Sequence, residues 1–145
     1  MSLDIKAYIP HREPFLFVDR VLEMTETTIL TEKTWRADED FFRGHYPENP
    51  ILPGVLMCES VFQTAAILLV ERLKAQGDGL SGKTPILSRI QDSRFKRRVL
   101  PGETVTMSVE LKETVGQFFF LSGRIEKDKK TVLTVDFALA LVNNE

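Results

Sequence analysis

Two side chains that can transfer protons lie near one another in the middle of the chain. Glu59 follows His45 by fourteen positions, and Pro47, Pro50 and Pro53 lie between them. Proline restricts its own backbone and that of the preceding residue, so we expect His45 in a stiff loop. The apolar sequence after Pro53 predicts a helix that carries Glu59. A histidine and a carboxyl group in this arrangement indicate general acid–base chemistry.

Two further residues could support such a reaction. Gly54 stands where the loop meets the helix, and unpaired N–H groups at a helix start can stabilise a developing oxyanion. Gln63 follows Glu59 by four positions, so it faces the same side of the helix and can orient the carboxyl group. The residues alone leave simpler roles open, in which Glu59 interacts with the helix dipole and His45 caps a turn.

The elements that must position these groups are one helix and a set of strands. The helix spans residues 54–76, is apolar around most of its circumference and is therefore expected to be buried. Glycines in residues 77–82 end it in a loop. The expected strands are 15–24 and 27–35 as a hairpin, followed after the helix by a meander of 85–95, 104–115, 117–127 and 131–142.

This order of elements predicts an α+β fold. About six mostly antiparallel strands would wrap around one long central helix, an arrangement that resembles the hot-dog fold. An open sheet edge favours pairing with a second copy of the chain. No repeat or linker divides the sequence, so we expect a single domain over residues 1–145.

Composition excludes several functional classes. The 145 residues carry 19 Lys and Arg against 21 Asp and Glu, a net charge of −2, so nucleic acid is not an expected partner. The single cysteine, Cys58, excludes an intrachain disulfide and fits a reducing compartment. No signal-peptide pattern is expected, and no run approaches the roughly 18 apolar residues that would predict a membrane span. The expected location is the cytoplasm.

Several motifs in the same order resemble one protein family. Residues 44–63 (GHYPENPILPGVLMCESVFQ) are similar to the signature of the 3-hydroxyacyl-[acyl-carrier-protein] dehydratases of type II fatty-acid synthesis. Residues 10–21 (PHREPFLFVDRV) resemble the opening of that family, and residues 93–103 (SRFKRRVLPGE) resemble its third-strand passage and turn. The similarity covers nearly the whole chain.

The resemblance implies a reversible loss of water from a 3-hydroxyacyl thioester, which gives the trans-2-enoyl thioester. His45 would remove the C2 proton, and Glu59 would protonate the departing C3 hydroxyl group. The N–H of Gly54 would polarise the thioester carbonyl. The Ile51 carbonyl would fix the tautomer of the imidazole, and Gln63 would orient the carboxyl group or a water. Proton transfer of this kind requires no metal and no organic cofactor.

The resemblance also implies partners. In the family, the histidine and the glutamate of one site come from different subunits, so a homodimer is required, and trimers of such dimers (homohexamers) are common. An acyl carrier protein would present the acyl chain. Residues 88–98 give independent support, since five basic residues there oppose one acidic residue, a local charge of +4. The docking candidates are Arg94, Lys96, Arg97 and Arg98, although such a stretch can also be a solvated strand end.

Departures from the family pattern predict a paralogue with its own chain-length preference. Ser60 and Phe62 stand where small apolar residues are usual, and Phe62 could narrow the acyl tunnel. Arg98 replaces a common proline, and Glu48 replaces a frequent glycine. Residues 85–87 lack the tyrosine that gates the tunnel in some members.

Alternative functions stay open at this point. One is a hot-dog acyl thioesterase, which usually lacks the Gly-His loop, and another is a non-catalytic acyl-binding paralogue. A dehydratase that also isomerises the double bond tends to carry aspartate at the position of Glu59. His11, together with Arg12, is expected to brace the N-terminal turn, and the two histidines offer no metal-ligand set.

Overall fold

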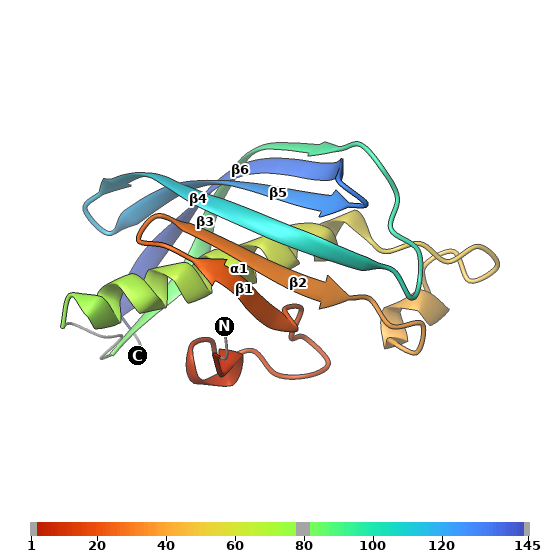
Figure 1. Ribbon diagram of the computed structural model, residues 1–145, viewed down its shortest axis with the longest axis horizontal. Helices are drawn as coiled ribbons and strands as arrows, with labels where there is room; N and C mark the ends of the chain where they lie inside the picture. Colours follow the sequence, from red (N-terminus) through yellow and green to blue (C-terminus); the bar gives the residue numbers. More distant parts are fainter. Residues whose placement is uncertain (1–2, 78–81, 144–145) are drawn as a thin grey trace.

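The apolar sequence after Pro53 forms the long helix α1 (Gly54–Ala75), and a curled sheet covers it, as Figure 1 shows. The computed structural model describes residues 3–77 and 82–143. The strands are β1 (Arg20–Met24), β2 (Thr28–Thr34), β3 (Lys83–Phe95), β4 (Thr104–Val115), β5 (Phe118–Lys127) and β6 (Lys130–Asn143). Two short 3₁₀ helices, η1 (Ile5–Ala7) and η2 (Asp40–Arg43), complete the described elements. The sequence therefore predicted the helix to within one residue, while residues 78–81 of the expected loop lie outside the described residues.

The strands form one antiparallel sheet in the order β1-β2-β4-β5-β6-β3. The expected meander is correct for β4, β5 and β6 but wrong for β3, which pairs with β6 instead of β4. The segment after β3 explains the difference, because it is too long for a hairpin turn. It crosses the end of the sheet, where the Leu52 amide donates to the Val99 carbonyl at 2.8 Å. As a result β3 is an edge strand, and most of its residues are exposed.

The core lies between α1 and the concave face of the sheet. Residues along β2, β4 and β5 alternate between buried and partly exposed positions, as expected for strands with one face on a core. Gly123 of β5 lies directly against Val61 of α1, and a Cβ atom at this position would collide with the valine side chain. The missing side chain allows the helix to lie close to the sheet.

Strand β1 is shorter than the sequence predicted. The expected strand began at residue 15, but the ladder with β2 begins at Arg20. The backbone of the preceding residues is paired with a side chain instead: the Phe17 amide donates to Gln63 Oε1 at 2.8 Å, and Gln63 Nε2 donates to the Phe15 carbonyl at 3.0 Å. A backbone whose polar groups are satisfied in this way does not need a neighbouring strand.

The sequence holds no unbroken run of about 18 apolar residues, since Glu59, Gln63 and Glu71 interrupt the apolar residues of α1. Helix α1 is long and apolar enough to cross a membrane by length and composition alone. Most of its residues are nevertheless buried against the sheet, from Met57 to Leu73. It is the core helix of this fold.

Candidate active site

His45 lies in a loop that we call the histidine loop (residues 44–53), held mainly by backbone hydrogen bonds. The His45 amide donates to the Phe41 carbonyl at 3.1 Å, and the Asn49 amide donates to the Tyr46 carbonyl at 2.8 Å. The ring Nδ1 of His45 lies 2.9 Å from the Ile51 carbonyl oxygen. A carbonyl oxygen can only accept, so Nδ1 carries the hydrogen and Nε2 keeps its lone pair.

Tyr46 gives the histidine loop an unusual backbone. Its φ angle is +53°, a left-handed conformation that residues with side chains seldom adopt. The tyrosine ring meets the His45 ring edge to face, with 4.7 Å between their centroids. Strain of this kind persists where the surroundings fix the chain, and here it accompanies a histidine with one defined orientation.

Glu59 lies in the second turn of α1 and is half-buried, with 24% of its side chain exposed. Gln63 Nε2 donates to Glu59 Oε2 at 3.1 Å, the contact that the spacing of four residues predicted. The Gln63 side chain is fully buried, and its remaining bonds go to Phe15 and Phe17. These backbone partners fix which end of the amide faces Glu59, since the Phe17 N–H requires an acceptor.

His11 does not brace the N-terminal turn, contrary to expectation. Arg12 does so, donating to the carbonyls of Lys6, Ile9 and His11 at 3.0, 2.9 and 2.7 Å. His11 instead points its Nε2 at Glu59 Oε2, 3.6 Å away. Burial lowers the pKa of His11, although the Glu59 carboxylate partly opposes this effect. Sequence reasoning missed this contact, and its one signal was a second histidine within a family-like motif.

Gly54 is the first residue of α1, where the helix leaves its N–H groups unpaired. The Phe95 ring of β3 lies across it, and a Cβ atom at position 54 would be 2.8 Å from Phe95 Cε1. A side chain at position 54 would therefore require the Phe95 ring to move. Phe95 remains 52% exposed, so the helix start and the end of β3 together reach the surface.

The docking candidates continue from Phe95 along the surface, and all four side chains are exposed. Arg94 pairs with Asp92 at 3.3 Å, and Arg97 donates to the Thr131 carbonyl. The basic stretch thus borders the start of α1. Among the described residues, no group of three or more His, Cys, Asp or Glu side chains is arranged to hold a metal ion.

No described contact joins His45 to Glu59 within the chain. His45 contacts Ile51 and Tyr46, whereas Glu59 contacts Gln63 and His11. Phe62, which the sequence placed near the acyl tunnel, is buried and packs against Phe137 with 4.8 Å between the ring centroids. Within the described residues of one copy, the two groups therefore have separate sets of contacts.

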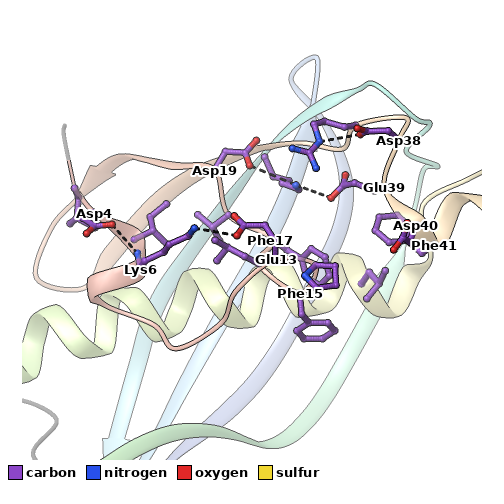
Figure 2. Close-up of a pocket in the computed structure, with 18 residues that line it drawn as sticks. Asp4, Lys6, Glu13, Phe15, Phe17, Asp19, Asp38, Glu39, Asp40 and Phe41 are labelled. Atoms are coloured by element: carbon purple, nitrogen blue, oxygen red, sulfur yellow. Dashed lines mark hydrogen bonds and ion pairs between the residues drawn. The ribbon is translucent and has the colours of Figure 1, made fainter.

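A cavity of about 790 Å³ lies elsewhere, between the N-terminal residues and η2 (Figure 2). Neither His45 nor Glu59 lines it. Its wall carries the buried Lys33 ammonium group, which is neutralised by Glu39 at 3.0 Å and Asp19 at 3.7 Å. Size alone does not identify the site of chemistry in this chain.

Fold and site together define a hot-dog protein with a histidine and a carboxyl group at the start of its central helix. The search of solved structures agrees with the fold. A dehydratase heterocomplex, ApeI:P from Xenorhabdus doucetiae, matches with a TM-score of 0.83 at 16% identity, over 99% of this chain and 93% of that chain. A thioesterase from Haemophilus influenzae matches with a TM-score of 0.63 at 16% identity, over 85% and 77%. These likenesses confirm the hot-dog fold alone.

Sequence relatives are more specific. The model of the FabA-like domain matches residues 9–136. The 3-hydroxyacyl-[acyl-carrier-protein] dehydratase FabZ of Clostridium beijerinckii is 41% identical over 143 residues, covering 95% of this chain and 96% of that protein. The enzyme of the same name from Clostridium perfringens strain SM101 is 37% identical over 138 residues, covering 95% and 96%. The chain belongs to the 3-hydroxyacyl-[acyl-carrier-protein] dehydratase family and is a hydro-lyase.

Proposed function

We propose that this chain removes water reversibly from a 3-hydroxyacyl thioester carried by an acyl carrier protein and releases the trans-2-enoyl thioester. The observation that carries the assignment of roles is the bond between His45 Nδ1 and the Ile51 carbonyl. It leaves the Nε2 lone pair free to take a proton, as a general base requires. The family relatives support the overall reaction.

In the proposed reaction, His45 Nε2 removes the C2 proton, and the electron pair of that bond passes toward the thioester carbonyl. The N–H of Gly54 stabilises the negative charge on the carbonyl oxygen. The electrons then form the C2–C3 double bond as the C3–oxygen bond breaks. Glu59 gives its proton to the departing hydroxyl group, which leaves as water. Only protons are transferred between the protein and the substrate, so the proposed steps call for no cofactor.

Gln63 is proposed to orient Glu59 during this transfer. Its amide is fixed by the backbone of Phe15 and Phe17, and its remaining N–H group reaches Glu59 Oε2. A carboxyl group anchored through one oxygen presents the other to the substrate. The same anchoring serves the reverse reaction, in which Glu59 accepts a proton from water.

Two copies of the chain are proposed to complete each active site. The edge strand β3 leaves backbone groups available for pairing and exposes Ile86, Leu87 and Ile90, so pairing with another β3 would satisfy this edge and reduce the exposed apolar area. Val55 at the start of α1 is 76% exposed and lies near the same surface as Phe95. A homodimer joined along β3 would bring His45 of one copy toward Glu59 of the other. Three such dimers could then form the hexamer that the resemblance implies.

Mixing two inactive variants tests the shared site. His45→Ala and Glu59→Gln chains, refolded together, should form heterodimers in which one of the two sites is intact. Half of randomly mixed dimers are heterodimers, so about a quarter of wild-type activity is expected. Activity no higher than that of the separate variants would contradict the shared site, while leaving the reaction itself intact.

The acyl carrier protein is proposed to dock on the basic stretch at the end of β3. Carrier proteins of this pathway are acidic, and the stretch provides complementary charge beside Gly54. Lys96 and Arg98 are the most useful residues to test, because Arg94 and Arg97 have structural partners. The Lys96→Glu, Arg98→Glu double variant should lower carrier-linked turnover and spare a small thioester analogue. Equal losses on both substrates would contradict docking.

The reaction itself is tested with a 3-hydroxybutyryl thioester. Wild type should produce enoyl absorbance, and His45→Ala and Glu59→Gln should each lose about 10²- to 10⁴-fold of the rate. Release of free thiol without enoyl product would instead identify a thioesterase. Binding of the thioester with neither product would identify an acyl-binding paralogue. A cytoplasmic location belongs to the same proposal and is tested by cell fractionation.

A further inference from the structure

Two side chains converge on the carboxyl group of Glu59 from two parts of the chain. Gln63 Nε2 donates to Oε2 from the next turn of α1, at 3.1 Å. His11 Nε2 approaches the same oxygen from the N-terminal segment (residues 9–19), at 3.6 Å. The backbone of that segment also fixes Gln63, through Phe15 and Phe17. Both of the described side-chain contacts therefore fall on Oε2.

We propose that His11 is a positioning residue for Glu59: its Nε2–H and the Gln63 amide together hold Oε2, so that Oε1 carries the proton given to the leaving hydroxyl group. This inference rests on the proposed function, because it concerns the acid of that reaction. The contact of 3.6 Å is longer than a hydrogen bond. Contacts of this kind in a free enzyme often shorten when substrate binds.

The tautomer of His11 follows from its surroundings. Its Nδ1 is buried and has no hydrogen-bond partner among the described residues. Its ring lies at 23° to that of Phe15, with 6.4 Å between the centroids. Nε2 alone faces an oxygen that can accept, so the neutral ring carries its hydrogen there. The two histidines of the chain thus have opposite tautomers, with Nε2 bare in His45 and protonated in His11.

Burial matters because it keeps His11 neutral. It lowers the pKa of His11, and the nearby Arg12 guanidinium group acts in the same direction, while Glu59 opposes both. A charged imidazolium beside Glu59 would form an ion pair with the carboxylate. That pair would favour the form of Glu59 that has no proton to give. A neutral N–H donor orients the carboxyl group without this effect.

Steady-state kinetics on the 3-hydroxybutyryl thioester tests the role. His11→Leu removes the donor, and we expect kcat to fall about tenfold while KM stays within about twofold. His11→Gln places an amide N–H near the position of Nε2, and its kcat should stay within about threefold of wild type. A kcat that falls in His11→Leu but not in His11→Gln indicates that His11 acts as a hydrogen-bond donor that positions Glu59. Thermal unfolding of both variants shows that each is folded.

Tyr8→Phe serves as the control for the N-terminal residues. It removes the 2.6 Å hydrogen bond that the Tyr8 hydroxyl group donates to Glu71 Oε2, a bond that anchors this region without contacting Glu59. Its kcat should match wild type. Wild-type kcat in His11→Leu would overturn the inference, and so would an equal loss in His11→Gln, which would show that an imidazole itself is needed.

Selective ¹⁵N labelling of the two histidines provides a second, independent measurement. The neutral rings should show opposite tautomers, and the His11 resonances should shift in Glu59→Gln. A bare Nε2 in His11 would overturn the assignment of Oε2. The Glu59→Gln variant separates failure of this inference from failure of the proposed function. If Glu59→Gln keeps the wild-type kcat, Glu59 is not the general acid and the proposed function fails. If Glu59→Gln loses activity but His11→Leu does not, only the role of His11 is contradicted.

Discussion

The histidine loop and the N-terminal segment both bring a histidine to the start of α1, but they are held in different ways. In the histidine loop, backbone groups bond to one another and a backbone carbonyl fixes His45. In the N-terminal segment, side chains bond to the backbone. Arg12 donates to three carbonyl groups, and the Gln63 amide bonds to the Phe15 carbonyl and the Phe17 N–H. The histidine loop should therefore tolerate single substitutions that the N-terminal segment does not.

The largest expected effect comes from His45→Ala. Loss of a general base should lower kcat about 10²- to 10⁴-fold, and stability should hardly change because backbone bonds maintain the histidine loop. Glu48→Ala, an exposed change in the same loop, is the matched control and should leave both quantities unaltered. Kinetics and thermal unfolding measure the two effects. A strongly destabilised His45→Ala variant would contradict the difference between the two segments, because it would show that the His45 side chain maintains the histidine loop.

The next effect comes from Gln63→Leu. This variant leaves the Phe17 N–H and the Phe15 carbonyl without their buried partner, so a loss of about 3 kcal/mol in the free energy of unfolding is expected. The kcat should fall as well, since Glu59 loses its anchor. Urea unfolding measures the stability change, and Gln76→Leu, at the exposed residue that follows the end of α1, is a control expected within about 0.5 kcal/mol. A Gln63→Leu variant as stable as its control would show that the N-terminal segment does not depend on Gln63 for its stability.

A matched pair of arginine substitutions sharpens the contrast. Arg12→Met should cost about 1 kcal/mol, because three backbone carbonyls lose a charged donor. Arg43→Met, beside the histidine loop, removes a single exposed pair with Asp40 and should cost less than about 0.5 kcal/mol. Both are measured by chemical unfolding. Equal costs would mean that side chains contribute no more to one segment than to the other.

The smallest effect concerns pH. Because the pKa of His11 is lowered in the folded chain, the unfolded chain binds more protons below about pH 6.5, and acidification reduces stability. Thermal unfolding between about pH 7.5 and about pH 5 should show a smaller loss for His11→Gln than for wild type. Parallel curves for the two proteins would indicate that His11 is not buried as a neutral ring.

Local sequence determined much of this protein. Proline spacing and the apolar run after Pro53 predicted the histidine loop and the bounds of α1, because the restrictions act within a few residues. The spacing of four residues predicted the contact between Glu59 and Gln63, whereas the contact between His45 and Ile51 was expected from the family resemblance. The family resemblance was likewise carried by contiguous motifs, and the relatives confirm it.

Tertiary structure alone decided the rest. His11 and Glu59 are 48 positions apart, and no periodicity in the sequence connects them. The position of β3 beside β6 and the shortened β1 also depend on partners far along the chain, Gln63 among them. A buried backbone must be satisfied by whichever polar group the fold brings near, and the sequence does not name that group. Sequence therefore specified the two side chains that are proposed to transfer protons, and packing determined what surrounds each of them.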